Sequence, residues 1–185
     1  MAVRRGKHDD FLIKAEKAAN ARGVRELGLV KGEDDGLGEL LQACETGEIK
    51  ALYICGDDIL DLAPERLSGI LAKLELLIVQ DLKLRPQFNG AAVVLPTTTF
   101  AEKDGTFTNH AGRVQRILPA LATPPGWLAD GEIFTGILNL LSSRRDRFEL
   151  GEVWAAMTRD GSAFAGLKFD EIGPNGAALG ATGGR

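Results

Sequence analysis

Three short, continuously apolar runs constrain the fold of this chain more than any other feature. They span Ala51–Cys55, Leu76–Val79 and Ala91–Leu95. An alternating pattern indicates a strand with one solvent-exposed face, whereas an unbroken apolar run is typical of a strand covered on both faces in a parallel sheet. Each run ends at polar or turn residues. The sequence therefore predicts three strands of a mainly parallel sheet.

Helices are predicted around these strands. Pro64 can open a helix between the first two runs, because apolar residues recur there at helical spacing. Residues 36–46 are predicted to form another helix, with Gly47 as its C-cap. The connection over residues 81–90 contains Pro86 and leaves room only for a short helix. The expected fold class is α/β, an open three-layer, Rossmann-like sandwich.

Three parts of the chain are expected: an N-terminal segment over residues 1–35, an α/β core domain over 36–118, and a helical, Gly-rich extension over 119–185. Residues 11–19 are expected as a short helix and 20–35 as a connection. Two amphipathic stretches, one from Trp127 or Asp130 to about Leu141 and one from Leu150 to Met157, are expected as helices. The last fifteen residues contain five glycines, so they are expected to be mobile and without a regular element.

Composition narrows the class of protein. The 185 residues are 44% hydrophobic and 26% charged, with a formal net charge of -4, so no global basic field would hold nucleic acid. Two cysteines are too few for an iron–sulfur cluster or an all-cysteine zinc site. No apolar run approaches the ~20 residues that span a bilayer, and no secretory signal develops. A cytoplasmic protein is therefore expected.

The ends of the predicted strands are the first candidates for a binding site, because ligands of open α/β sheets bind outside the carboxyl ends of the strands. These ends carry Gly56, Asp57 and Asp58 after the first run, Gln80 and Asp81 after the second, and Thr97, Thr98 and Thr99 after the third. Glycine allows a close backbone approach, the carboxylates can accept from ribose or guanine, and the threonines can donate to phosphate. The alternative interpretation is that these residues cap the following helices and turns.

Other catalytic patterns are weak. Gly36 and Gly38 lack a third glycine and precede a strand, which is the wrong order for a dinucleotide turn, and no P-loop is present. His8 and His110 have no metal-ligand spacing, and no catalytic residue is predicted. Glu102 and Asp104 could form an acid/base pair or simply serve a turn. Residues 97–115 combine small, polar and glycine residues, so we expect a functional loop there.

A family resemblance rests on this same region. Ala92–Pro96, Ala101–Asn109 and Gly112–Gln115 resemble a signature of the molybdopterin oxidoreductase superfamily, of the form VVLP, AEK(D/E)GTFTN and GRVQ. Further similar segments are Ala51–Asp58, Ile78–Asp81 and Asp10–Lys17, so the resemblance covers roughly residues 9–118 in order. The greatest similarity is to the large iron–sulfur subunit of bacterial NADH:quinone oxidoreductase, with formate dehydrogenase-like subunits next.

The resemblance implies part of a larger protein, whose iron–sulfur cysteines and further domains lie outside this chain. In molybdenum-containing relatives the corresponding loops lie near a guanine-dinucleotide form of the molybdopterin cofactor. Together with the strand-end argument, this defines one set of candidate cofactor-binding residues: Gly56, Asp57, Asp58, Asp81, Thr98, Glu102, Gly105, Asn109 and Arg113. The chain departs from the family where Asp81 is followed by Leu82–Pro86 instead of a Thr-containing helix start.

Two hypotheses of different classes follow from the resemblance. The first is a scaffold domain of a respiratory NADH:quinone oxidoreductase, which takes part in electron transport only within the complex. The second is a cofactor-binding module of a formate dehydrogenase-like oxidoreductase. In both, the expected partners are other domains or subunits, with self-association through exposed apolar surface as a further expectation and peripheral attachment to the inner membrane through a complex. A third alternative is a stand-alone α/β binding protein.

Overall fold

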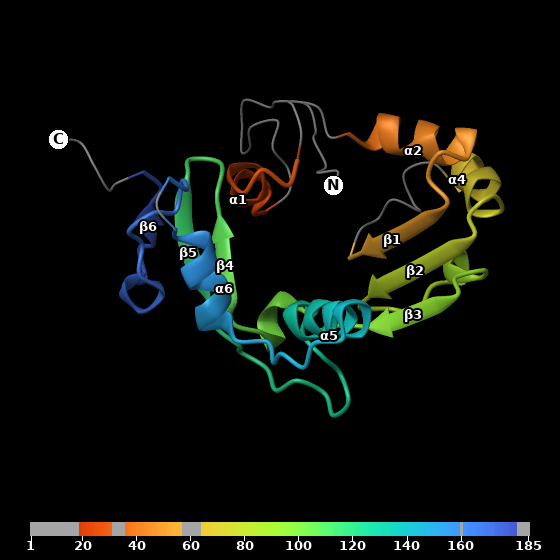
Figure 1. The fold of residues 1–185 in the computed structure, drawn as a ribbon. Coiled ribbons are helices and arrows are strands. Elements are labelled where there is room, and N and C mark those ends of the chain that lie inside the picture. Colours follow the sequence, from red (N-terminus) through yellow and green to blue (C-terminus); the bar gives the residue numbers. More distant parts are fainter. Residues whose placement is uncertain (1–18, 31–35, 57–63, 160, 181–185) are drawn as a thin grey trace.

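The computed structural model describes residues 19–30, 36–56, 64–159 and 161–180 (Figure 1). Of the predicted features, the helix over residues 11–19 lies almost entirely outside the described residues. Asp57 and Asp58 also lie outside them. Among the described residues, no helix is long and apolar enough to cross a membrane.

A three-stranded parallel sheet forms one end of the molecule, as the apolar runs predict. Its order is β1 (Ala51–Cys55), β2 (Leu76–Asp81) and β3 (Val93–Pro96). The register places Tyr53 opposite Ile78, and Ile78 opposite Val93. The third strand begins two residues later than predicted.

Helices and the sheet enclose the first hydrophobic core. Helix α2 (Leu37–Thr46) ends at Gly47, whose φ of 79° is the left-handed conformation predicted for a C-cap, and α4 (Pro64–Leu71) connects β1 with β2. Only a 3₁₀ turn, η1 (Pro86–Phe88), fits between β2 and β3. This confirms the open α/β arrangement. The buried members of this first cluster are Leu41, Cys44, Leu52, Ile54, Leu67, Ile70, Leu77, Val79 and Phe88.

A second, antiparallel sheet replaces the loop expected over residues 97–115. After the 3₁₀ turn η2 (Phe100–Glu102), strands β4 (Gly105–Thr108) and β5 (Arg113–Ile117) form a hairpin. Strand β6 (Ala177–Ala178) pairs with β5, so the expectation of no regular element in the last fifteen residues is wrong at this point. The hairpin was not predicted because its strands contain many polar residues. An antiparallel strand can contain them, since one of its faces can remain solvated.

Two predicted C-terminal helices are confirmed, as α5 (Asp130–Ser142) and α6 (Leu150–Met157), and a 3₁₀ turn, η3 (Phe169–Glu171), follows them. A second cluster of buried residues, Val114, Trp154, Phe164 and Ile172, lies between α6 and the antiparallel sheet.

The connection expected over residues 20–35 contains a helix, α1 (Ala21–Glu26). Glycine lowers helix propensity, but Gly23 is needed here because an added Cβ would lie 2.9 Å from Thr108 Oγ1. Packing against β4 therefore explains a helix that local propensity does not predict.

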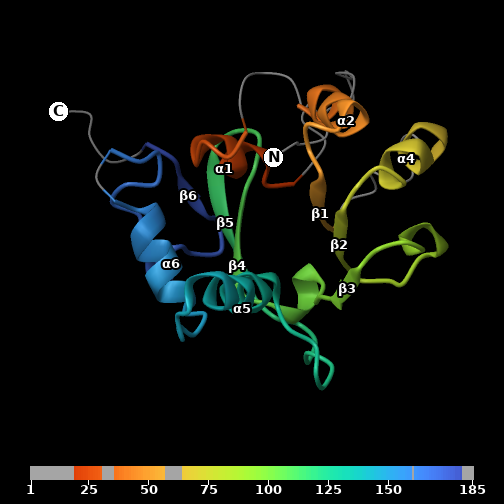
Figure 2. The ribbon, with the colours of Figure 1, turned by 45° about the vertical axis from the view of Figure 1, so that its right-hand side comes forward.

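The two sheets lie at opposite ends of a crescent, with η2 and α5 between them (Figures 1 and 2). The carboxyl ends of β1, β2 and β3 point toward the middle of the crescent. Residues at these strand ends therefore lie close to the junction between the two halves.

Candidate functional site

The carboxyl edge of the parallel sheet brings together residues from all three strands. Gly56 continues the pairing beyond β1 by donating its backbone N–H to Gln80 O at 2.8 Å. Thr97 follows β3, and its backbone forms a parallel bridge with Leu128, which leads into α5. The start of α5 is thus held against the strand ends.

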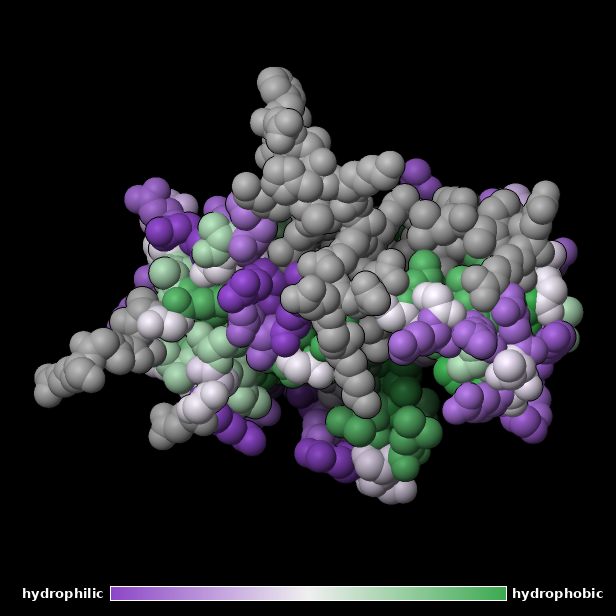
Figure 3. Space-filling model, turned by 90° about the horizontal axis from the view of Figure 1, so that it is seen from above, coloured by the Kyte–Doolittle hydropathy of each residue, from purple (hydrophilic) through white to green (hydrophobic). Residues whose placement is uncertain are grey.

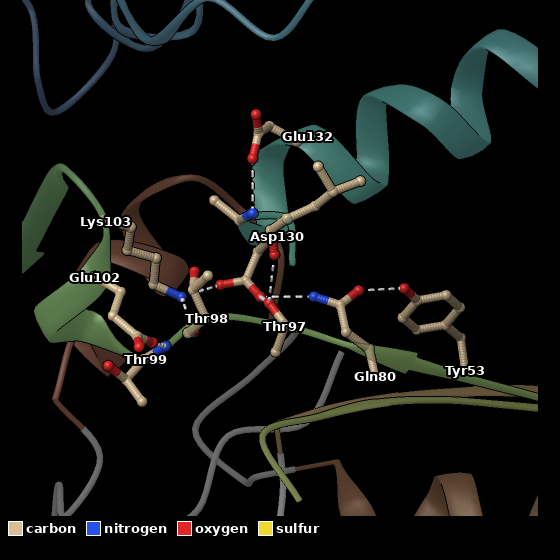
Figure 4. Close-up of polar contacts among 11 residues, drawn as sticks. Tyr53, Gln80, Thr97, Thr98, Thr99, Glu102, Lys103, Asp130 and Glu132 are labelled. Atoms are coloured by element: carbon tan, nitrogen blue, oxygen red, sulfur yellow. Dashed lines mark hydrogen bonds and ion pairs between the residues drawn. The ribbon is translucent and has the colours of Figure 1, made fainter. Parts of the chain in front are cut away.

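A partly buried polar network centres on Asp130, the first residue of α5 (Figure 4). Gln80 Nε2 and Thr97 Oγ1 each donate to Asp130 Oδ1 at 2.6 Å. Lys103 Nζ forms an ion pair with the other carboxylate oxygen and also donates to Thr98 O at 3.3 Å. One carboxylate therefore joins the second strand, the segment after the third strand and the segment after η2.

The network extends from Gln80 to the first strand, because the Tyr53 hydroxyl donates to Gln80 Oε1 (Figure 4). Burial, the neighbouring Cys55 and the carboxylate of Asp130 together raise the pKa of Tyr53 to about 12. The phenol therefore remains a neutral hydrogen-bond donor at physiological pH.

Asp130 is ionised in this environment. Burial alone would raise its pKa, but hydrogen bonds from Lys103, Thr97 and Gln80 and the lysine charge outweigh burial and lower the pKa. For Cys55, burial of the thiol and the nearby Asp130 raise the pKa to about 11, although part of the residue is exposed. The thiol is therefore protonated and poorly nucleophilic.

Thr98 carries an unsatisfied polar group at this edge. The residue is 1% exposed, and its Oγ1 has no hydrogen-bond partner in the part of the chain that the structure describes. A buried hydroxyl without a partner costs free energy, so native structures rarely retain one without a reason. At the same edge but across β2, a Cβ added to Gly56 would meet no atom of the described residues within 4 Å.

Two other predicted site residues have carboxylates that already accept bonds from the chain itself. Asp81 Oδ1 accepts from the backbone N–H groups of Leu82 and Lys83, at 2.6 and 3.2 Å, and Asp81 also pairs with Arg85. Glu102 Oε2 accepts from the backbone N–H of Thr99 at 2.7 Å, which completes a capping box for η2. The capping interpretation of the sequence fits both of these contacts.

The remaining predicted site residues lie on the β4–β5 hairpin and not at the parallel strand ends. Gly105 begins β4. Asn109 Oδ1 accepts from the backbone N–H groups of Ala111 and Arg113, both at 3.0 Å, and so closes the hairpin turn. Arg113 Nη1 donates to the carbonyl of Asn175 at 3.0 Å, which ties β5 to the C-terminal segment.

Three residues of the network were not predicted at the site: Tyr53, Lys103 and Asp130. Gln80 was predicted at the end of the second run but was not included in the set of cofactor-binding candidates. The polar Gln80 within an apolar strand was a usable signal, because a buried amide needs partners. In the sequence, Asp130 has the position of an ordinary helix start. The residues next to Asp130 and Lys103 give no indication that the two side chains form an ion pair.

The fold and the site define a class of protein: an α/β domain with a polar site at the carboxyl edge of a parallel sheet. Residues 11–137 of the chain match the family described as Molybdopterin oxidoreductase. The chain therefore belongs to the molybdopterin oxidoreductase family.

Individual relatives agree with this family. The chain is 34% identical over 136 residues to a Bacillus subtilis (strain 168) protein named "Putative formate dehydrogenase YrhE". It is 32% identical over 166 residues to a Staphylococcus aureus (strain USA300) protein with the same descriptive name. These matches cover 72% and 89% of this chain but only 14% and 16% of the two relatives.

The family implies a molybdopterin cofactor, and the strand ends offer a fit to its polar, organic part. An unpartnered buried hydroxyl at Thr98 can donate to a phosphate or accept from a base or sugar, and the open space at Gly56 permits close approach. No cluster of three or more His, Cys, Asp or Glu side chains that could hold a metal ion occurs within the described ranges.

Proposed function

We propose that this chain is a cofactor-binding module of a formate dehydrogenase-like molybdopterin oxidoreductase, and that the carboxyl edge of β1–β3 binds the guanine-nucleotide half of the cofactor. The bound cofactor would supply the redox chemistry. The chain itself would bind and orient the nucleotide, through Gly56 and the hydroxyl of Thr98. Electron transfer and formate chemistry would need the rest of such a protein.

The unpartnered Thr98 hydroxyl is the observation that carries this proposal. It is buried at the strand ends, where ligands of open α/β sheets bind. The names of the relatives support formate dehydrogenase-like chemistry as the setting. Asp81 and Glu102 are less suitable than the sequence predicted, because their carboxylates already serve backbone N–H groups.

The other sequence hypothesis, a scaffold domain of NADH:quinone oxidoreductase, has no support from the names of these relatives and stays a prediction. Attachment to a respiratory complex also stays a prediction. So does the division of the chain into three parts, after residues 35 and 118. Partners within a larger oxidoreductase remain part of the proposal, since the relatives are far longer than this chain.

A thermal-shift experiment with guanosine diphosphate tests the proposal on the full chain. With a Kd of about 0.1 mM, 1 mM nucleotide would stabilise the folded state by about 1.4 kcal/mol. This corresponds to a rise in Tm of about 3–5 °C for a chain of this size. In Thr98→Val the rise should vanish, because valine keeps the shape of threonine and removes the hydroxyl.

Two controls make the result specific. Thr106→Val, on β4 and away from the strand ends, should keep the full shift. Adenosine diphosphate should give a smaller shift than guanosine diphosphate if the base is recognised. Flat melting curves with millimolar guanosine diphosphate, or an equal shift in Thr98→Val, would overturn the proposal.

A further inference from the structure

Helix α5 carries an apolar stripe that the described part of the chain leaves largely uncovered. Phe134, Leu138 and Leu141 recur at i, i+4 and i+7, on one face of the helix, and are 47%, 49% and 82% exposed. Leu140, one residue before Leu141 in the chain, is 85% exposed but lies on another side of the helix. No charged side chain occurs from residue 133 to 143. In the space-filling view, hydrophobic residues gather on a protrusion between the two ends of the molecule (Figure 3).

The segment after α5 folds back along the helix and forms one flank of this stripe. The chain turns at Ser143, whose φ is 54°. Asn139 then exchanges two hydrogen bonds with the backbone of Asp146, at 2.8 and 3.0 Å. Further on, the ring of Phe148 lies against Gly131, so close that an added Cβ would lie 2.2 Å from it. Residues 144–148 therefore run antiparallel to α5.

This flank is basic. Its charged residues are three arginines, at positions 144, 145 and 147, and one aspartate at 146, so its net charge is +2. Arg144 pairs with Asp146 at 2.7 Å. Arg145 and Arg147 are exposed and form no ion pair within the described ranges. Two cationic groups therefore stand beside the apolar stripe.

We propose that the α5 stripe and its basic flank form a docking surface for an acidic amphipathic helix of another polypeptide. An apolar stripe on a helix is covered well by the stripe of a second helix, and acidic residues beside that stripe would face Arg145 and Arg147. Such charges add specificity and speed association.

Two other occupants fit this surface less well. In an antiparallel pair of α5 helices, two-fold symmetry would place two flanks of charge +2 side by side. An anionic membrane would have to attract a chain whose net charge is -4. The net charge of -4 opposes an acidic peptide as well, but the few acidic groups of a peptide can lie at the flank alone, within the roughly 8–10 Å over which salt leaves charges unscreened, whereas a membrane presents its charge to a whole face of the chain. The local charge of the flank therefore favours an acidic protein partner.

A pair of designed peptides tests the proposal. Both are fluorescein-labelled 18-residue helices with the same leucine stripe, one with glutamate and the other with lysine beside the stripe. A helix of 13 residues is about 20 Å long and buries less than the ~800 Å² per partner of a stable interface, so a Kd of tens of micromolar is expected. Fluorescence anisotropy should show the full chain binding the glutamate peptide about ten-fold more tightly than the lysine peptide.

Variants of the full chain locate the surface. Leu138→Glu should abolish binding of the glutamate peptide, whereas Leu29→Glu should not. Leu29 is 54% exposed and donates its backbone N–H to Val24 of α1, and α1 lies apart from α5 in both ribbon views. The double variant Arg145→Glu/Arg147→Glu should reverse the preference between the two peptides. Both residues are exposed, so the fold should survive.

Each other result would overturn the proposal. Equal affinity for the two peptides would remove the charge argument, and loss of binding in Leu29→Glu would show a general hydrophobic effect. Concentration-dependent dimerisation that Leu138→Glu abolishes would assign the surface to a second copy. Binding to vesicles of phosphatidylglycerol and phosphatidylcholine that Leu138→Glu abolishes would assign it to a membrane.

Discussion

At the scale of single residues, Thr98 illustrates how a candidate ligand-binding group can oppose stability. Its hydroxyl is buried without a described partner, so the free chain bears a desolvation cost that a ligand could remove. Valine has nearly the same shape and no hydroxyl. Replacing Thr98 by valine therefore tests the effect of the hydroxyl on ligand binding without removing the packing that folding requires.

Thr98→Val should stabilise the ligand-free chain by about 1 kcal/mol, because the unpaired hydroxyl is removed while the packing is kept. The change can be measured as the free energy of unfolding in urea. A loss of stability instead would show that the hydroxyl has a hydrogen-bond partner in the folded chain. Thr106→Val serves again as the comparison.

Asp130 is the residue whose charge matters most for the junction. Asp130→Asn should lower the free energy of unfolding at pH 7 by about 1–3 kcal/mol, because the ion pair with Lys103 is lost. The matched control is Asp146→Asn, which breaks the exposed pair with Arg144 and should change stability by less than about 0.5 kcal/mol.

The pH dependence gives a second test of Asp130. Its pKa is lowered in the folded chain, so its contribution is complete above the unfolded value of about 3.9 and is lost as pH falls through the folded value. The difference in unfolding free energy between the wild type and Asp130→Asn should therefore shrink between pH 7 and pH 3. A constant difference across this range would contradict an ionised Asp130 in the network.

At the scale of elements, α5 shows how a glycine can be required at one helix position and costly at another. At Gly131, an added Cβ would clash with the ring of Phe148, whereas at Gly136 it would meet no atom of the described residues within 4 Å. Both residues lie in the same helix. Packing against the returning segment, and not helix propensity, decides the residue at position 131.

Gly131→Ala should destabilise the chain by about 1–3 kcal/mol, because Phe148 must move. Gly136→Ala should stabilise it by up to about 1 kcal/mol, because alanine favours a helix interior. Urea unfolding followed by circular dichroism measures both. Equal effects of the two changes would show that Phe148 does not pack on Gly131.

At the scale of the whole molecule, the two larger hydrophobic clusters share no residue, and a third, smaller cluster contains Ala21 and Val30. Helix α5 lies between the two halves and contributes no residue to either cluster, and the Asp130 network connects its start to the parallel sheet. Chains with two such cores often depart from two-state unfolding. Probes placed in the two halves should therefore give separate urea midpoints of unfolding.

Phe164→Ala should lower the urea midpoint seen by Trp154 fluorescence more than the midpoint seen by labelling of Cys44, which is fully buried in the first cluster. Loss of a buried phenylalanine costs about 3–5 kcal/mol, and here it affects only the second cluster. A Trp127→Phe and Cys55→Ser background isolates the two probes. Equal shifts of both midpoints would show that the clusters unfold as one unit.

Local patterns carried much of the fold. The sequence predicted β1, β2, the helix ending at Gly47 and the helix from Leu150 to Met157. These elements could be predicted because the pattern of apolar residues that indicates a strand or a helix involves only residues close together in the chain. The β4–β5 hairpin and α1 could not. Their stability depends on partners far along the chain, such as Thr108 for Gly23 and β6 for β5.

The candidate site divides in the same way. The sequence by itself determined that the strand ends carry polar residues, and the placement of Thr98 among them, since the end of an apolar run is a local signal. Only the tertiary structure decided which of these groups are free to bind. Gln80 and Asp130 are 50 residues apart, and Thr97 and Asp130 are 33 apart, so no local pattern records that they share hydrogen bonds. Whether a polar side chain is satisfied or left unpaired depends on such distant contacts, because hydrogen bonding is decided by geometry in the folded chain.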